Sequence, residues 1–266
     1  MAYFKRSIPA EGRIDCSCGF SRRPFADHPT YAEASFHATI FTSDKEAKPH
    51  THIPIAGRGA THETYLVTHE STKPGALIYL GEKAFQARPG VVVHVTPGVV
   101  HGGIGTFTPL ILGAPGFARG GNVEVEEIAE QKRIIAECSN NLIVPADYLL
   151  GKGFVKLDSE HPALSFTDIY GAPGGSIILA QTDRNELHCA ATPNCRLNSD
   201  EFARSGGPTF VTVLNGWGEI TIDQKPVQVK KLDALLLEAG TNFSIGLGLS
   251  TAIMNVHPQN VRNLIR

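Results

Sequence analysis

Three histidines and one glutamate in the first half of the chain have types and spacing that suit a metal ion. They are His50 and His52, separated by one threonine, then Glu63, and finally His101 after a Pro-Gly-Val-Val segment. Because alternate side chains of a strand share a face, His50 and His52 can point toward one place. Imidazole and carboxylate donors together suit Fe, Mn, Ni, Cu or Zn. The four residues therefore predict a site for one divalent transition metal, whose identity stays open.

Three imidazoles and one carboxylate would leave coordination positions of such a metal free for a substrate or O₂. A bidentate enolate, catecholate or hydroxyketone could bind there, and the metal would act on it as a Lewis acid. With a redox metal, O₂ could then attack the activated carbanion. With a redox-inert metal, the same arrangement supports enolisation, isomerisation or cyclisation. Glu63 could serve both as a ligand and as the base that takes the substrate proton.

Two neighbouring histidines compete for a role near this cluster. His62 directly precedes Glu63, and neighbours on a strand point to opposite faces, so both could enter one barrel only across a bulge. We favour Glu63 as the ligand, and leave open whether His62 replaces or assists it. His94 lies on the face opposite Val91, Val93 and Val95. It is either a pocket acid or base, or a strand histidine with a structural role.

Composition limits the class of protein. A chain of 266 residues fits one large domain or two of ordinary size. The hydrophobic content of 42% and the charged content of 19% predict a folded core rather than a disordered chain. A net charge of −2 gives no basic field for nucleic acid. The 27 glycines and 17 prolines indicate many tight turns, as in an all-β fold.

The location is predicted from apolar stretches and cysteines. The first residues contain no long apolar stretch, so we expect no secretory signal. No stretch is long and apolar enough to span a membrane, and we expect no membrane partner. The five cysteines are an odd number, which argues against a full disulfide framework and for a reducing compartment. Cys16 and Cys18 are too close in sequence to bridge without strain. We expect a cytoplasmic protein.

Strand patterns occupy both ends of the chain and a helical pattern separates them. Strand-like runs cover residues 36–41, 64–68, 76–80, 84–87 and 91–95, and later 176–180, 209–214, 219–222, 227–229 and 234–237. Between them, Asn122 could cap an amphipathic helix that ends near Cys138. A connector follows to residue 153, with a short helical turn expected at 145–150.

The second half of the chain repeats the order of strands and turns found in the first half. Three residues after a late glycine, Gly98 leads to His101, whereas Gly240 leads to Phe243. We predict two copies of one all-β unit, of which only the first carries ligands. The second half does contain four other residues that could bind a metal, none of them at the spacing of the first set: His161, His188, Glu201 and His257.

The motif residues resemble the two motifs of the cupins. His50-Thr51-His52 and Glu63 are similar to the first motif, and Gly90 with the segment from Pro97 to His101 matches the second. Ten residues separate His52 from Glu63, more than is usual in this family. Glu70 stands where the family glycine would fall. Insertions before Glu63 and near residues 71–74 would account for both departures.

The resemblance implies a bicupin, in which two double-stranded β-helix barrels, jelly-roll-like in form, are joined by a short helical connector. We divide the chain into an N-terminal barrel (1–121) with the metal site, a connector (122–153) and a degenerate C-terminal barrel (154–266). In this family the motif histidines and glutamate bind one divalent metal. The apolar segment 111–117 is similar to one in quercetinase-like dioxygenases. Dimers are common among such barrels, so the resemblance also suggests a homodimer.

Three functions follow from the resemblance and the donor set. The first is a metal-dependent dioxygenase, an oxidoreductase acting on an enolic or aromatic hydroxy-ketone small molecule. The second is a non-oxidative isomerase, epimerase or polyketide cyclase, and the third a non-catalytic bicupin that binds a metal or ligand. Tyr65, Tyr79, Phe85 and Phe107 are candidate pocket aromatics. Trp217 follows a hairpin-like Asn-Gly and is expected in packing or at an interface.

Overall fold

The computed structural model describes two continuous regions and several strand backbones. The regions are residues 3–125, apart from 17, 33, 46–47, 56–58, 69 and 119, and residues 207–256. Between them it describes the backbone of residues 144–145, 155–156, 163–165, 175–181, 185–191 and 197–198. Within these residues the chain forms strands and two short 3₁₀ helices, η1 (Ile8–Ala10) and η2 (Pro29–Ala32). No helix of the described residues is both long and apolar enough to cross a membrane.

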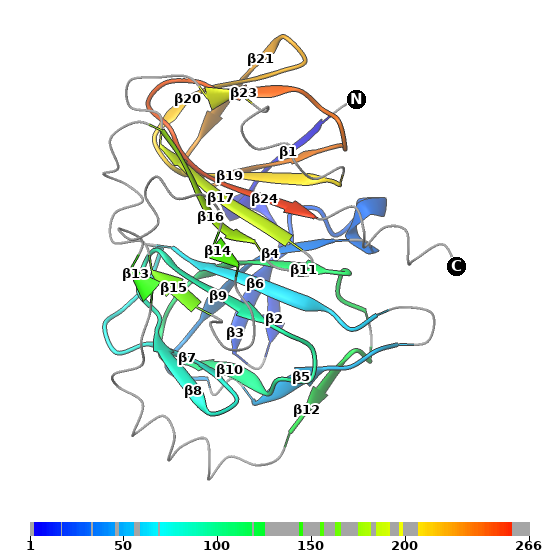
Figure 1. Cartoon of the computed structure of the whole chain (residues 1–266), viewed down its shortest axis with the longest axis vertical. Helices are drawn as coiled ribbons and strands as arrows, with labels where there is room; N and C mark the ends of the chain where they lie inside the picture. The colour runs from blue at the N-terminus through cyan, green and yellow to red at the C-terminus, as the bar shows by residue number, and fades with distance from the viewer. Residues whose placement is uncertain are drawn as a thin grey trace.

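The first barrel consists of two sheets (Figure 1). The larger sheet has the strand order β13 (Val144–Pro145), β15 (Ala163–Ser165), β9 (Val91–Val95), β6 (His62–Val67), β11 (Pro109–Ala114), β4 (Ser35–Phe41), β3 (Gly19–Arg22) and β2 (Ile14–Cys16). The smaller sheet has the order β12 (Asn122–Glu124), β5 (His50–His52), β10 (His101–Ile104), β7 (Leu77–Leu80) and β8 (Lys83–Gln86).

The second barrel is built in the same way. Its larger sheet has the order β1 (Tyr3–Ser7), β22 (Asp233–Leu237), β19 (Thr209–Asn215), β24 (Ser250–Val256), β17 (Asn185–Ala191), β16 (Gly175–Gln181) and β14 (Val155–Lys156). Its smaller sheet has the order β18 (Leu197–Asn198), β23 (Phe243–Ile245), β20 (Trp217–Ile222) and β21 (Lys225–Lys230). The pairing of β6 with β9 and β11 corresponds to that of β19 with β22 and β24. The predicted internal repeat is therefore present in the topology.

At one edge of each larger sheet, strands from one half of the chain pair with the other half. The N-terminal strand β1 pairs with β22 of the second barrel, with Tyr3 opposite Leu237. In the other direction, β15 pairs with β9 of the first barrel, with Leu164 opposite Val92. In Figure 1 the blue β1 accordingly lies among the strands of the second barrel. The barrel boundaries given in the sequence analysis remain predictions. The pairing of strands across those boundaries is a further feature that the sequence did not predict.

The central strands of the larger sheets, β4, β6, β9 and β11 in the first barrel and β19, β22 and β24 in the second, are almost entirely buried, which explains their long apolar runs. Along a strand of either larger sheet, alternate side chains point into the barrel or toward the other barrel. In β6, Tyr65 packs inside the first barrel, whereas Leu66 packs in the layer between the barrels. Phe36 and Phe210 stack across that layer with ring centroids 5.4 Å apart. The inner face of each larger sheet is thus fixed by strand alternation, and this face carries the site.

The strand predictions are confirmed, and the helical connector is not. All ten predicted runs fall on β4, β6, β7, β8, β9, β16, β19, β20, β21 and β22. Asn122 does not cap a helix: residues 122–124 form β12, which pairs antiparallel with β5. Pro145, where a helical turn was expected to begin, lies in β13. The remainder of both predicted helical segments, 126–138 and 146–150, lies outside the described residues.

Candidate metal centre and its cavity

Strand register brings the four predicted residues together. His101 on β10 lies directly opposite His50 on β5, and His52 shares the face of His50. Glu63 projects from β6 of the facing sheet. The candidate ligand atoms of all four residues lie within 4.8 Å of one another. Among the described residues this is the one group of three or more such side chains that could hold a metal ion.

Glycines in the second motif allow β10 to approach its neighbours. Gly98 has a φ of +82°, which a side chain would disfavour, and its N–H donates to the His52 carbonyl at 3.1 Å. The Pro-Gly turn is thereby tied to β5 just before β10 begins. At Gly102, a Cβ atom would lie 2.1 Å from the Tyr79 hydroxyl. Both glycines therefore help to place His101.

Each histidine is held through Nδ1. The Nδ1 atom of His50 lies 3.2 Å from the Lys48 carbonyl, and that of His101 lies 3.0 Å from the Val99 carbonyl. Because a carbonyl only accepts hydrogen bonds, Nδ1 of both rings must carry the proton. His52 contacts Asn122 Oδ1 through Nδ1 at 2.8 Å. In the neutral rings, the Nε2 lone pairs are then left to face the cluster.

Glu63 is a buried carboxylate surrounded by donors. Its Oε2 atom lies 3.0 Å from Nε2 of His101 and 3.3 Å from Nε2 of His52. The Tyr65 hydroxyl donates to the same oxygen at 2.6 Å. Burial raises the pKa of Glu63, but His52 and His101 lower it by more, so its pKa lies well below the usual value. Glu63 is therefore ionised.

This arrangement fits a divalent cation. The Nε2 atoms of His52 and His101 are buried and have no hydrogen-bond partner in the described structure. With Nδ1 protonated, their lone pairs would face the Glu63 carboxylate without a proton between them, which is unfavourable unless a cation lies there. Three imidazoles and a carboxylate are donors that Fe, Mn, Ni, Cu and Zn accept. The coordinates therefore satisfy the donor requirements of the predicted metal.

Protonation of the rings would compete with a metal. Burial and the neighbouring His101 lower the pKa of His50 to about 4, so this ring is neutral near pH 7. Burial also lowers the pKa of His52, but the charge of Glu63 and the contacts with Glu63 and Asn122 together raise it by more, and the net shift is upward. A proton on His52 is thus the natural competitor of a metal ion in this cluster.

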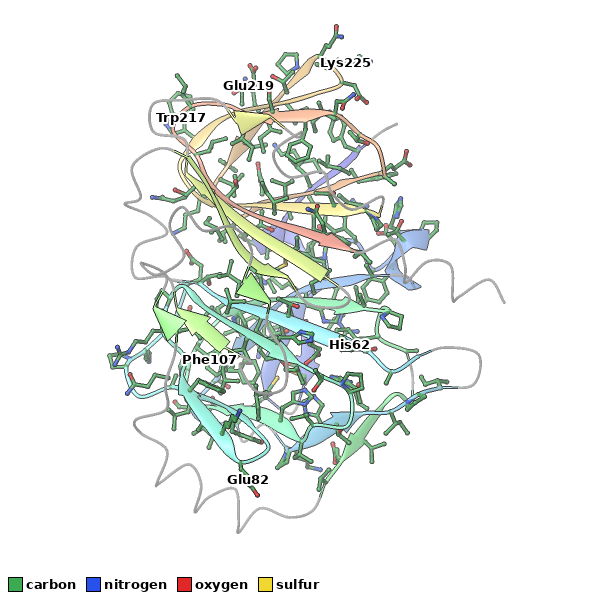
Figure 2. All side chains as sticks on the ribbon, viewed as in Figure 1. His62, Glu82, Phe107, Trp217, Glu219 and Lys225 are labelled. Carbon is green, nitrogen blue, oxygen red and sulfur yellow. The ribbon has the colours of Figure 1, made fainter. Side chains whose placement is uncertain are left out.

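His62 points away from the cluster, as strand alternation requires. Its ring stacks on that of His94, with centroids 5.7 Å apart, on the opposite face of β6 and β9 (Figure 2 labels His62). His94 is buried, and its Nδ1 lies 3.1 Å from the Glu63 carbonyl. The structure therefore brings Glu63, and not His62, to the three histidines. The geometry of His94 agrees with a structural role rather than with a pocket acid or base.

A cavity of about 500 Å³ adjoins the cluster. It is reached by His50 and Glu63 and is otherwise lined by Cys16, Cys18, Ser21, Arg23, Tyr31, His37, Thr39, Phe41, Lys48, Tyr65, Ile111, Phe117, Ala118, Gly120, Asn122 and Glu124. Of the predicted aromatics, only Tyr65 belongs to this lining, whereas Tyr79, Phe85 and Phe107 are buried in the barrel. Five lining residues come from β2, β3 and β4, for which no part in the site was predicted from the sequence: Cys16, Ser21, His37, Thr39 and Phe41.

One wall of the cavity carries a chain of polar contacts. His37 and Tyr31 stack with ring centroids 5.7 Å apart, and the Tyr31 hydroxyl contacts Nε2 of His37. The charge of Arg23 lies close enough to Tyr31 to oppose the rise that burial gives the pKa of its hydroxyl. Burial and the charge of Arg23 lower the pKa of His37 to about 3. His37 is therefore neutral at ordinary pH, and Phe117 packs against it with centroids 4.8 Å apart.

A pair of free thiols lies on another wall. The Sγ atoms of Cys16 and Cys18 are 2.7 Å apart. The hydrogen bond from Cys18 lowers the pKa of Cys16 to about 6, whereas that same bond and burial raise the pKa of Cys18. Lys45 adds a nearby positive charge that favours the Cys16 thiolate.

The remaining predicted residues do not contribute to the described site. Trp217 is 80% exposed at the outer end of the second barrel, so the expectation that it packs in the interior is wrong (Figure 2). Its place at an interface stays a prediction. The side chains of His161, His188, Glu201 and His257 lie outside the described residues.

Solved structures share this fold. Protein Ylba from E. coli matches with a TM-score of 0.56 and 9% identity, over 96% of this chain and 91% of that one. A variant of salicylate 1,2-dioxygenase from Pseudoaminobacter salicylatoxidans matches with a TM-score of 0.56 and 11% identity, over 86% and 71%. An oxalate decarboxylase matches with a TM-score of 0.57 and 12% identity, over 96% and 77%.

These likenesses confirm the predicted cupin fold. No family model matches the sequence, and no curated protein matches it. At identities of 9 to 12%, a shared fold carries no information about substrate or reaction. The chemistry must therefore be argued from the side chains of the cluster and its cavity.

Proposed function

We propose that the protein is a metal-dependent dioxygenase acting on an enolic or aromatic hydroxy-ketone small molecule. The observation that carries the proposal is the convergence of His50, His52, Glu63 and His101 beside a cavity of about 500 Å³. Because His50 and Glu63 line that cavity, a metal bound by the cluster would be open to a small molecule inside it. We take all four residues as the metal ligands.

The size and lining of the cavity suit a planar organic ligand. Small-molecule sites usually enclose about 300 to 1,000 Å³ and combine apolar walls with a few polar groups. Here Phe41, Ile111 and Phe117 supply apolar surface, and Thr39 and His37 supply polar groups. Flat aromatic walls of this kind favour a ring-shaped substrate and exclude water from it.

Protein side chains would prepare the reaction in two ways. When bound, the metal would supply Lewis acidity that lowers the pKa of a chelated hydroxyl and, if redox-active, the electron chemistry that O₂ requires. Tyr65 holds the Glu63 carboxylate through its 2.6 Å hydrogen bond. We assign Glu63 as the acceptor of the substrate proton. Its lowered pKa makes it a weak base, which suits a hydroxyl whose own pKa is lowered.

A non-oxidative reaction such as isomerisation, epimerisation or cyclisation is the second candidate. It is favoured by the buried Glu63–Tyr65 pair, which offers a carboxylate and a phenol for proton transfer without any need for O₂. The fold is shared by a dioxygenase and a decarboxylase, and so does not decide between the two.

Oxygen consumption tests the proposal. Purified protein is first examined by elemental analysis, and Fe-, Mn-, Ni- and Cu-loaded samples are then mixed with flavonols and other enolic aromatics in an oxygen electrode. We expect a stoichiometric transition metal, lost in His50→Ala and Glu63→Ala, and oxygen uptake with at least one redox metal. Turnover under argon with Zn²⁺ would favour the second candidate. Absence of any bound metal would overturn both.

A further inference from the structure

Arg23 is an unusual cation in this cavity. It directly follows β3, lines the cavity, and lies close enough to Tyr31 for its charge to oppose the rise that burial gives the pKa of that hydroxyl. Its Nε atom is buried and has no hydrogen-bond partner in the described structure. Among the described residues, no carboxylate forms an ion pair with it. A guanidinium that keeps donor capacity inside a cavity is suited to bind an anion that enters from solution.

The other lysine or arginine of the cavity lining is already paired. Lys48 forms a 2.8 Å ion pair with Glu124, and both side chains are largely exposed. Glu63, the buried acid of the cavity lining, faces the three histidines. Among the described residues that line the cavity, Arg23 is therefore the cation that has no acidic side chain beside it to balance its charge.

Aromatic contacts connect Arg23 with the metal cluster. Phe117 packs on His52, with ring centroids 5.6 Å apart, and on His37, with centroids 4.8 Å apart. His37 in turn contacts Tyr31, whose hydroxyl lies close enough to Arg23 to feel its charge. The neutral His37 adds no charge that would compete for an anion. A flat molecule alongside Phe117 could thus reach the cluster with one end and Arg23 with the other.

We propose that Arg23, assisted by Tyr31, forms a carboxylate subsite, so that the substrate is an aromatic or enolic acid whose carboxylate lies away from its metal-chelating oxygens. The inference rests on the proposed function and adds the class of substrate to it. A single guanidinium matches one carboxylate in both charge and planar, two-point geometry. A phosphate would bring more negative charge than this wall neutralises.

Ligand pairs that differ only in charge test the subsite. Zn²⁺-loaded protein, which cannot turn over O₂, is titrated calorimetrically with 3,4-dihydroxybenzoate and with 3,4-dihydroxybenzamide. Both compounds chelate through the catechol, and only the first carries a carboxylate. We expect wild-type protein to bind the acid about 10- to 100-fold more tightly than the amide, as one charge-assisted, two-point contact predicts.

Substitutions at Arg23 identify the group responsible. Arg23→Gln should remove the preference for the acid and leave the dissociation constant of the amide unchanged. Arg23→Lys keeps the charge and the aliphatic stem, should recover only part of the preference, and serves as the test if Arg23→Gln does not fold. Lys48→Gln is the matched control, because it removes an equal charge from the same lining and should leave most of the preference in place.

The possible failures can be told apart. If the amide binds and Glu63→Ala abolishes its binding, but the acid binds no better, the proposed metal site stands and the carboxylate subsite is overturned. An equal loss of preference in Lys48→Gln and Arg23→Gln would also overturn it, since the effect would then be general electrostatics. If inorganic phosphate displaced the acid as effectively as a carboxylate ligand does, the effect would again be general electrostatics and the carboxylate subsite would be overturned. If Zn²⁺-loaded protein binds neither compound, both proposals fail.

Discussion

The two barrels share one topology and differ in what fills them. By strand register, Glu63 lies opposite Val95 in the first barrel, and Thr209 lies opposite Leu237 in the second. Three residues after each late glycine, the first barrel has His101 and the second has Phe243, which is buried among aliphatic side chains. The interior of the second barrel is thus closed by apolar packing where the first holds a charged cluster. The same scaffold can be used for stability or for chemistry, depending on a few inward positions.

The largest expected effect is the loss of the metal in His101→Ala. Removing one of four ligands should lower metal affinity by more than about 100-fold, because removal of outer-shell partners alone costs 10- to 100-fold. Elemental analysis and titration with Zn²⁺ or Fe²⁺ would measure the change. Phe243→Ala, at the matching position of the second barrel, should retain the metal. Equal metal loss in both variants would contradict the comparison.

For the stability of the metal-free protein we expect the opposite order, with the larger loss in the second barrel. Phe243→Ala removes a buried ring and should lower the free energy of unfolding by about 3 to 5 kcal/mol. His101→Ala should cost the metal-free protein much less, since its ring lies among polar groups, with Nε2 3.0 Å from Glu63. Urea denaturation of both metal-free variants would measure the difference, and a larger loss in His101→Ala would contradict it.

The stability of the metal-free protein should fall in acid because the first barrel buries a neutral imidazole. The pKa of His37 is about 3 in the folded protein and about 6.5 when unfolded, so the unfolded state binds more protons between these values. Stability therefore declines as pH falls below about 6.5. The contribution of His37 should reach about 3 kcal/mol by pH 4.

His37→Gln isolates this effect from the other histidines. His50 acts in the same direction, because its pKa is also lowered, so the wild-type slope alone is not specific. Urea denaturation of both proteins from pH 7 to pH 4 should give a shallower dependence for the variant. An unchanged slope would show that His37 is not held neutral.

The close approach of β10 to β7 predicts a further loss of stability. In Gly102→Ala, the new Cβ would lie 2.1 Å from the hydroxyl of the buried Tyr79, and relief requires movement of that ring or strand. We expect destabilisation of about 2 kcal/mol, as for other overpacked cores. Gly59→Ala is the control, because nothing lies within 4 Å of its Cβ position. Thermal denaturation should separate the two variants.

The smallest predicted effect concerns the support of His52. Asn122→Ala removes the 2.8 Å partner of its Nδ1 and should weaken metal binding about tenfold. Val123→Ala, at an exposed position of the same strand, should leave affinity unchanged. Calorimetric titration would compare them, and equal affinities in both variants would mean that Asn122 does not orient the ring.

Local pattern was enough to predict ten of the described strands and the four residues of the cluster. Period-two alternation puts Glu63 and His62 on opposite faces, and the Pro-Gly turn indicates where His101 enters the barrel. The segment 35–41 carried an unused signal: Ser35, His37 and Thr39 alternate with apolar residues and form a polar inner face. That pattern predicts an inward His37 from sequence alone.

Other features depend on pairings distant in sequence. Asn122 resembles a helix cap locally, but antiparallel pairing of β12 with β5 overrides that preference. Arg23 meets Tyr31 only through the course of the chain between β3 and β4. Strand exchange between the halves likewise has no local signature. Such contacts depend on tertiary packing, which composition and periodicity do not encode.

The crossed edge strands imply that the polypeptide cannot be cut cleanly into two working modules. A fragment ending before residue 163 would lack β15 and leave the outer edge of β9 without its neighbour. A fragment starting after residue 7 would lack β1 and uncover β22 in the same way. Bare strand edges recruit other chains. Each half expressed alone should therefore tend to aggregate, whereas the two co-expressed pieces should reassemble.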